Sequence, residues 1–196
     1  IYLCCVANGN NIVTTNIIGT DASGENDLGN HSAGIILDRT SFNIIGPNNI
    51  IAYNFGQGIS LWDEASFNTI TKNSIYNNGE QGIYLANPNR LPAPIIFDFD
   101  LQGGSLAGVT CANCIVEVFS DYAEEGAFFE DQTVADNTGF FTINTGVNFT
   151  GPHLTATATD SNGTTSNFSA PTSGTNRILT LQAGNILNKS PIKPKR

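Results

Sequence analysis

The chain has 196 residues, a formal net charge of −9 at pH 7, 40% hydrophobic residues and no methionine. This length suits two modest domains, and the acidic balance argues against nucleic acid and anionic membranes as partners, because few basic side chains are available to neutralise phosphate groups. No apolar run of the sequence is long enough to cross a bilayer.

A four-residue pattern, Gly-Ile-x-Leu, recurs in the first half of the chain. It begins at Gly34, Gly58 and Gly82, so its spacing is 24 residues both times. The first three residues, Ile-Tyr-Leu, match the end of the same pattern. A constant period in this range is typical of a solenoid, in which each repeat stacks on the next.

Two further short clusters of β-branched residues lie between successive copies of the pattern, and an asparagine precedes each of them. Asparagine and glycine tolerate positive φ, so we expect three short strands per repeat, separated by tight bends. Stacked asparagines can hydrogen-bond along the axis of such a solenoid. The expected stacked pairs are Asn43 over Asn68, Asn49 over Asn73 and Asn54 over Asn78.

The Gly-Ile-x-Leu strands and the Asn-x-Ile clusters resemble the right-handed parallel β-helix repeat of many secreted prokaryotic proteins. The resemblance covers about residues 1–87, or three to four coils, and parallel crossovers are overwhelmingly right-handed. It implies a fold rather than an activity, because such coils occur in lyases, hydrolases, adhesins and inert stalks. Since Ile1 falls within a coil, we expect further coils of the same protein to precede it and to cover the sheet edges.

An insertion separates the first coil from the second, and it carries Asp21, Glu25 and Asp27. Insertions in solenoids form loops that often lie on the binding face, and these three carboxylates are candidate Ca²⁺ ligands. A solvated turn is the simpler interpretation, because the full spacing of a calcium-binding loop is absent.

The four cysteines form two close pairs. Cys4 and Cys5 are adjacent, and three alternatives remain open for them: pairing with an upstream segment, a vicinal disulfide, or burial as small apolar residues, which is the default. Cys111 and Cys114 lack the further ligands of a zinc site and a following helix that would activate a thiol, so we expect a local disulfide, which suits an oxidising compartment.

A proline-rich segment, residues 88–94, ends the repeats and is expected to be a stiff linker. After it the pattern becomes alternating, with predicted strands at residues 115–119, 128–134, 140–143 and 154–159. Short strands separated by turn residues favour a β-sandwich. We expect the acids of residues 121–131 to lie in a solvated loop.

The segments Cys-Ala-Asn-Cys-Ile-Val-Glu-Val-Phe-Ser-Asp and Gly-Pro-His-Leu-Thr-Ala-Thr-Ala-Thr-Asp resemble the Ig-like modules that often follow β-helices on bacterial surface proteins. This resemblance covers about residues 95–172 and implies a Greek-key sandwich that acts as a spacer or as a ligand-binding module. Residues 173–196 form an extension with a basic tail, which we expect to be disordered.

Alternation along the Gly-Ile-x-Leu strands predicts which side chains face outward. Ser60 and Tyr84 fall in one outward column, and Asp38 and Trp62 fall in the next. An exposed Trp62 and Tyr84 beside Asp38 are suited to stack on a sugar ring and to bind its hydroxyls. The alternative is that Trp62 packs under a loop or against the second domain.

Asp38, Asp63 and Glu64 are weak candidates for catalysis. Glycoside hydrolysis requires two carboxyl groups about 5–10 Å apart, one of them with a raised pKa. A polysaccharide lyase requires a base, and Arg39 is the one basic residue close by in the sequence. No nucleophilic triad, phosphate-binding loop or dinucleotide fingerprint is present in the sequence.

The sequence therefore predicts an all-β, secreted or cell-surface protein of prokaryotic type. The leading hypothesis is a structural or adhesive module that recognises a polysaccharide or a cell-surface glycan, with no cofactor except possible Ca²⁺. The alternative is a fragment of a polysaccharide lyase or glycoside hydrolase whose catalytic coils lie mostly upstream of Ile1.

Overall fold

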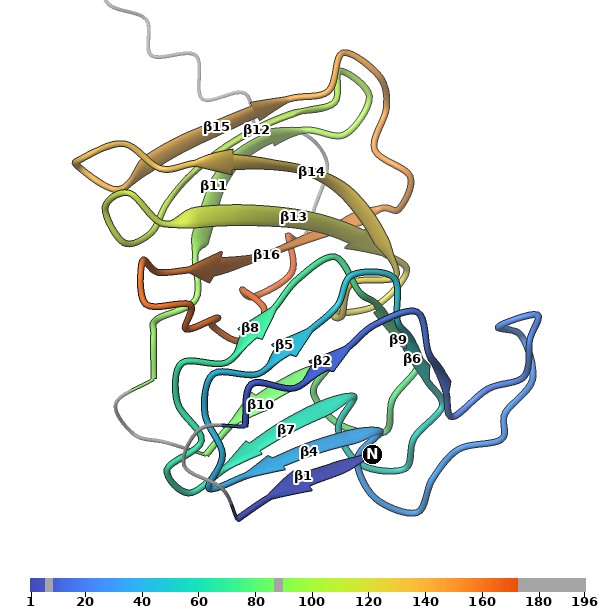
Figure 1. Ribbon diagram of the computed structural model, residues 1–196. Helices are drawn as coiled ribbons and strands as arrows, with labels where there is room; N and C mark the ends of the chain where they lie inside the picture. The colour runs from blue at the N-terminus through green and yellow to red at the C-terminus, as the bar shows by residue number, and fades with distance from the viewer. Residues whose placement is uncertain (6–8, 87–89, 173–196) are drawn as a thin grey trace, which may run out of the picture.

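The structure is a computed structural model that describes residues 1–5, 9–86 and 90–172. The expected tail at residues 173–196 and part of the linker lie outside the described residues. Within them the chain is all-β: it forms strands, turns and bends and no helix (Figure 1).

The first half of the chain forms three parallel sheets. The chain visits them in turn, so that β1, β2 and β3 lead to β4, β5 and β6, and then to β7, β8, β9 and β10 (Figure 1). One passage through the three sheets is called a coil below. The first sheet contains β1 (Tyr2–Cys4), β4 (Ile35–Asp38), β7 (Ile59–Trp62) and β10 (Ile83–Leu85); the second contains β2 (Ile12–Val13), β5 (Ile44–Ile45) and β8 (Thr69–Ile70); the third contains β3 (Ile17–Ile18), β6 (Ile50–Ala52) and β9 (Ser74–Tyr76).

The apolar residues of the repeat form the core of the coils, as the alternation predicts. The register pairs Ile35 with Ile59 and Leu37 with Leu61, and Ile83 pairs with Ile59 from the other side. All of these side chains are buried. Burial of a large aliphatic side chain contributes about 1.5–3 kcal/mol, so the repeated Gly-Ile-x-Leu strands supply much of the drive for stacking.

The three predicted asparagine columns are present. Asn43 donates from its side-chain amide to Asn68 Oδ1 over 2.9 Å, Asn49 donates to Asn73 over 2.8 Å, and Asn54 donates to Asn78 over 2.9 Å. The first coil extends the columns through Asn11, Asn16 and Asn30. In each step the donor belongs to the earlier coil and the acceptor to the later one, so the columns have a direction.

The second half forms two three-stranded antiparallel sheets. One has the order β11-β12-β15 and the other has the order β14-β13-β16, and residues of both contribute to one core cluster, which includes Val118 and Phe141. The strands are β11 (Ile95–Asp100), β12 (Ser105–Val109), β13 (Ile115–Asp121), β14 (Phe128–Val134), β15 (Phe140–Asn144) and β16 (His153–Thr159). Cys111 and Cys114 form the expected local disulfide just before β13.

The sheet that contains β13 packs directly on the last coil (Figure 1). Phe119 and Phe168 belong to the second half of the chain, yet they are buried in the same cluster as Ile70, Ile75 and Ile83 of the coils. Backbone bonds reinforce this contact, since Ile75 and Gly126 exchange two hydrogen bonds of 2.9 and 3.0 Å. The two halves therefore share a core at their junction.

The end of the third asparagine column is completed by a carboxylate from the second half. Asn78 donates from its backbone N–H to Glu125 Oε2 over 3.0 Å and from its side-chain amide to Glu125 Oε1 over 3.1 Å. One coil earlier, Asn54 uses the same two groups, its backbone N–H and its side-chain amide, to donate to Asn78 Oδ1. Glu125 therefore takes the place that an asparagine of a further coil would occupy. The expectation of a solvated loop for the acids of residues 121–131 is wrong here, because Glu125 and Asp121 are only 7% and 3% exposed.

Candidate functional site on the outer face of the first parallel sheet

The outer face of the sheet β1-β4-β7-β10 carries the predicted columns. Ile36, Ser60 and Tyr84 are aligned by the register, and Asp38 is aligned with Trp62 on the adjacent strand. The Trp62 and Tyr84 side chains are 41% and 36% exposed. The neighbouring strands β7 and β10 thus each present one partly exposed aromatic residue.

Trp62 is held by a neighbour on its own strand. Its indole Nε1 donates a hydrogen bond of 2.6 Å to the hydroxyl of Ser60, which is fully buried between Ile36 and Tyr84 in the outward column. This bond satisfies the buried hydroxyl and restricts the orientation of the indole ring. Ser60 therefore acts by positioning Trp62, and it is not itself accessible to a ligand.

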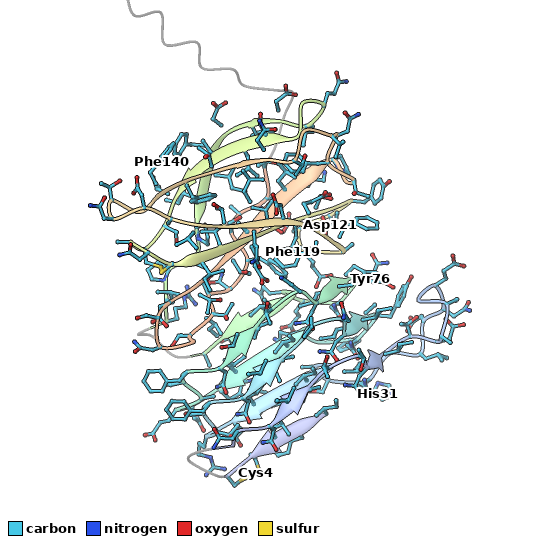
Figure 2. The ribbon with its side chains drawn as sticks, turned by 45° about the horizontal axis from the view of Figure 1, so that its top comes forward. Cys4, His31, Tyr76, Phe119, Asp121 and Phe140 are labelled. Atoms are coloured by element: carbon cyan, nitrogen blue, oxygen red, sulfur yellow. A yellow bond between two sulfur atoms is a disulfide. The ribbon has the colours of Figure 1, made fainter. Side chains whose placement is uncertain are left out.

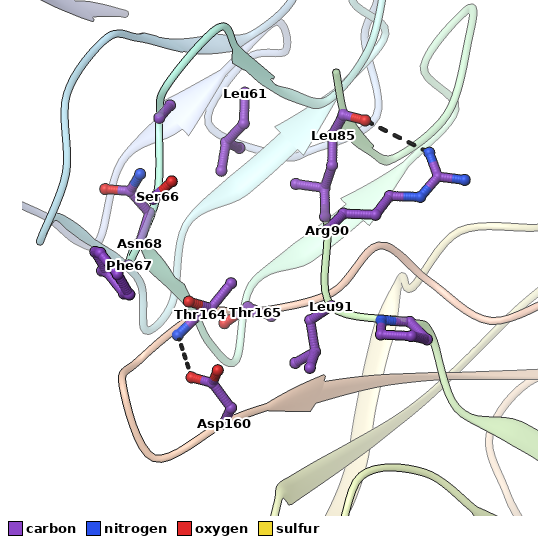
Figure 3. Close-up of a pocket in the computed structure, with 12 residues that line it drawn as sticks. Leu61, Ser66, Phe67, Asn68, Leu85, Arg90, Leu91, Asp160, Thr164 and Thr165 are labelled. Atoms are coloured by element: carbon purple, nitrogen blue, oxygen red, sulfur yellow. Dashed lines mark hydrogen bonds between the residues drawn. The ribbon is translucent and has the colours of Figure 1, made fainter. Parts of the chain in front are cut away.

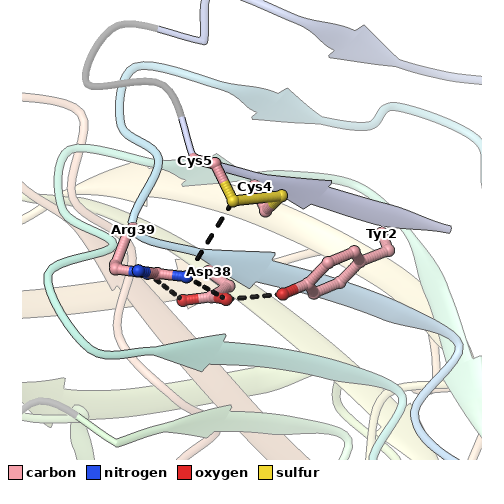
Figure 4. Close-up of polar contacts among 5 residues, drawn as sticks. All are labelled: Tyr2, Cys4, Cys5, Asp38 and Arg39. Atoms are coloured by element: carbon pink, nitrogen blue, oxygen red, sulfur yellow. Dashed lines mark hydrogen bonds and ion pairs between the residues drawn. A yellow bond between two sulfur atoms is a disulfide. The ribbon is translucent and has the colours of Figure 1, made fainter.

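Asp38 lies in a small polar cluster at the end of β4 (Figure 4). Its carboxylate accepts a hydrogen bond of 2.5 Å from the Tyr2 hydroxyl and pairs with Arg39 Nε at 3.0 Å. The bonds from Arg39 and Tyr2 hold the pKa of Asp38 below its usual value, and the bond to Asp38 raises the pKa of Tyr2. Asp38 is therefore ionised and engaged at neutral pH.

Cys4 and Cys5 form a vicinal disulfide beside this cluster (Figure 4). Cys5 is exposed, so burial as small apolar residues, which was the default expectation, is wrong for this pair. Arg39 Nη2 lies 3.9 Å from Cys5 Sγ. The strand β1 thus ends in a covalently restricted turn next to the Asp38 carboxylate.

Asp63 and Glu64 follow Trp62 in the exposed turn after β7. The register aligns Asp38 with Trp62, so Asp63 lies one position beyond the residue opposite Asp38. Neither carboxylate is hydrogen-bonded to any residue that the structure describes. Both are free to contact a ligand that lies over Trp62.

Two acids of the insertion, Asp21 and Asp27, stabilise their own loop. Asp21 accepts hydrogen bonds from the Ser23 hydroxyl and the Asn26 amide, which hold its pKa well below the usual range. Asp27 Oδ1 accepts a bond of 2.9 Å from the backbone of Gly29. Over residues 1–5, 9–86 and 90–172, no group of three or more His, Cys, Asp or Glu side chains is arranged to hold a metal ion.

The carboxyl groups with raised pKa lie at the junction of the two halves, away from this sheet. Burial raises the pKa of Glu117, which accepts bonds from the Thr71 hydroxyl and the Lys72 backbone N–H. Burial also raises the pKa of Glu125 to about 7. Sequence reasoning missed both residues. Their partners lie more than 40 positions away in the chain, so no local pattern indicates them.

The raised pKa of Glu125 predicts a pH dependence of stability. Between the ordinary pKa of 4.5 and about 7, the folded protein keeps a proton that the unfolded chain releases, so stability falls as pH rises through this window. The raised pKa of Glu117 acts in the same direction. Asp21 and Asp38 have lowered pKa values, so the stability that they contribute is lost only when the pH falls below about 4. We therefore expect the melting temperature to be highest near pH 5 and to decline toward pH 8, as measured by calorimetry.

Glu125→Gln is the control for this prediction. It removes the titrating group and keeps the size of the side chain, so the decline between pH 5 and pH 8 is expected to become shallower. A pH profile that is identical in the two proteins would contradict the assignment to Glu125.

A cleft of about 500 Å³ lies beside the described end of the linker (Figure 3). Leu61 and Leu85 of the coils and Leu91 of the linker supply its apolar wall. Its charged residues bond to nearby backbone, because Arg90 donates to the Leu85 carbonyl and Asp160 accepts from the Thr164 N–H over 2.9 Å. The Arg90 bond holds the linker against the last coil, and the Thr69 hydroxyl, which donates to the Gly163 carbonyl over 2.9 Å, holds the second half there, so the cleft is a structural seam.

No family model and no curated protein matches this chain. Among the residues that the structure describes, none belongs to a helix long and apolar enough to span a membrane.

Proposed function

We propose that this protein is a non-enzymatic structural or adhesive module that binds carbohydrate on the outer face of the sheet β1-β4-β7-β10. We further propose that residues 1–87 are a right-handed parallel β-helix and that residues 95–172 are an Ig-like sandwich joined by the linker 88–94. The ordered visits to three parallel sheets support the first assignment, and the two antiparallel sheets around one core support the second.

One observation carries the proposed binding site: Trp62 is exposed, oriented by Ser60 and next to the strand that carries exposed Tyr84. An aromatic face stacks on the apolar face of a sugar ring, and nearby charged groups bind its hydroxyls. Asp63 and Glu64 offer free acceptors, and Arg39 offers a half-exposed donor group.

The state of the Asp38 cluster favours binding over hydrolysis. A glycosidase needs one carboxyl group with a raised pKa, and the pKa of Asp38 is lowered. The Tyr2 hydroxyl has a raised pKa, so it is not prepared to act as a base. These directions support a site that recognises a ligand without reacting with it.

The two disulfides support a location outside the reducing cytosol. We propose that the protein is secreted or displayed on a prokaryotic cell surface. The melting temperature before and after reduction of both disulfides tests whether the two disulfides contribute to the stability of the folded protein.

Trp62→Ala is expected to weaken glycan binding about tenfold, which corresponds to the loss of about 1.4 kcal/mol of stacking. A glycan array with and without Ca²⁺ identifies the ligand, and titration calorimetry measures the change. Phe55→Ala is the control, because Phe55 is also an exposed aromatic residue of the coils but is not on this sheet.

Three outcomes of the glycan experiment would overturn the proposal. Release of reducing ends that is lost in Asp63→Asn or Glu64→Gln would identify a glycosidase or lyase. Equal binding by Trp62→Ala and the unchanged protein would remove the outer face from consideration. An array without any binding would leave the module as a spacer.

A further inference from the structure

A second cleft, of about 540 Å³, lies between the insertion loop of the first coil and the turn that joins β13 to β14. Its walls include Tyr53 and Tyr76 of the coils, Glu25 of the insertion, and Tyr122 and Phe128 of the second half. Figure 2 shows Tyr76 on the part of the coils that faces the region of Asp121, which also lines the cleft. It is distinct from the outer face of the first sheet, because it shares no residue with the Trp62 site.

The walls of this cleft are held in place by specific contacts. The Tyr76 hydroxyl donates a hydrogen bond of 2.6 Å to the carbonyl of Gly24, which fixes the insertion against β9. Gly24 has a φ of 77°, and a Cβ atom there would lie 2.8 Å from that hydroxyl, so glycine permits the close approach. On the other side, Ser74 donates to the carbonyl of Ala127 over 2.7 Å.

The aromatic residues are arranged at angles to one another. The rings of Tyr53 and Tyr76 meet edge to face, with centroids 5.9 Å apart and planes 79° apart. Tyr122 is 76% exposed, and no residue that the structure describes bonds to its hydroxyl. Rings that meet at a large angle offer faces to a compact group from more than one direction.

The charge of the cleft is of one sign. Among the residues that the structure describes, its charged lining residues are Glu25 and Asp121, and neither lysine nor arginine lines it. Asp121 is buried and accepts two backbone hydrogen bonds, whereas the exposed Glu25 carboxylate receives none from the described residues. Burial raises the pKa of Tyr76, and electrostatic interactions with Tyr53, Glu25 and Asp21 raise it further.

We propose that this cleft binds an organic ammonium group between its tyrosine rings, with Glu25 as the counter-ion. Aromatic faces carry the negative end of the ring quadrupole, so they attract a cation within about 6 Å of the centroid. A carboxylate beside such rings adds Coulomb attraction, and both features repel an anionic ligand. Substituted amines, lysine side chains and amino sugars share this ammonium chemistry.

Titration calorimetry at neutral pH and low salt tests the proposal with matched probes. Choline is compared with 3,3-dimethylbutan-1-ol, which replaces the quaternary nitrogen with carbon, and glucosamine is compared with N-acetylglucosamine, which lacks the charge. We expect at least one of choline, glucosamine and lysine methyl ester to bind saturably and about tenfold more tightly than an uncharged counterpart. The three probes thereby distinguish quaternary amines, amino sugars and lysine-like ligands.

Two exposed positions allow the site to be altered without disturbing the fold. Tyr122→Ala and Glu25→Gln are each expected to weaken ammonium binding about fivefold. Phe55→Ala serves as the control and is expected to leave ammonium binding unchanged, because Phe55 is 78% exposed and lines neither this cleft nor the Trp62 site. The proposal is overturned by equal binding of charged and uncharged probes, by the absence of saturable binding for all three amines, or by unaltered affinity in both variants.

Discussion

Replacing Phe119 with alanine is expected to lower the free energy of unfolding by about 4 kcal/mol, because large aromatic truncations in a packed core typically cost 3–5 kcal/mol. Phe119 belongs to β13, but it is 3% exposed and lies in the core cluster of the coils. Its ring meets those of Phe129 and Phe168 edge to face at 5.7 and 5.4 Å. The substitution therefore removes contacts that join the two halves.

Urea denaturation with two probes tests this prediction. The single tryptophan, Trp62, lies in β7 and reports on the coils by fluorescence, while far-ultraviolet circular dichroism reports on both halves. In the unchanged protein the two signals are expected to change together, and in Phe119→Ala they are expected to separate. Phe55→Ala is the control, because that ring is 78% exposed. A loss below about 1 kcal/mol would mean that the halves are stable without this contact.

Replacing Glu125 with alanine is expected to lower the free energy of unfolding by about 3 kcal/mol. The substitution leaves the backbone N–H of Asn78 without its acceptor, and an unsatisfied donor costs about 1–3 kcal/mol. The side-chain amide of Asn78 also loses its bond to Glu125 but keeps the carbonyls of Ile51 and Tyr76 as acceptors. The effect is expected to be larger near pH 5 than near pH 8, because the contribution of Glu125 decreases as it ionises.

Glu124→Ala is the matched control for the Glu125 prediction. Glu124 is the adjacent residue and is exposed, so its loss is expected to change stability by less than about 0.5 kcal/mol. Equal effects at the two positions would show that the carboxylate of Glu125 does not complete the asparagine column. Chemical denaturation at both pH values gives the comparison directly.

Much of the first half was predictable from sequence because its determinants are local and repeated. The 24-residue spacing of Gly34, Gly58 and Gly82 fixes which strands pair, and the position of each asparagine fixes the columns. Alternation within each strand then places Trp62 and Tyr84 outward. Each inference uses residues within a few positions of one another in the sequence, and the 24-residue repeat then applies it to every coil.

The junction between the two halves was not predictable, because its contacts do not repeat along the sequence. Nothing near Glu125 in the sequence indicates Asn78 as its partner, and an acid in a hairpin is most often solvated. The cleft that contains Tyr76 and Tyr122 was missed for the same reason, since its walls come from three separate segments. The pairing of Cys4 with Cys5 depended on a choice among three alternatives that adjacency alone does not decide.

The direction of the asparagine columns gives the stack two chemically different ends. Each asparagine of a column donates to the asparagine of the later coil. At the β1 end the columns therefore begin at Asn11, Asn16 and Asn30, and no described residue donates to the side-chain oxygens of these three residues. At the opposite end, Glu125 accepts from the last donors of the third column, those of Asn78. Two copies placed with their β1 ends together would oppose acceptor to acceptor, whereas a unit that presents donors would continue each column. Because the second half covers the last coil, the scaffold can be lengthened at the β1 end, and a fusion of further coils ahead of β1, each directing its amide donors toward the later coil, provides a way to build longer rods from it.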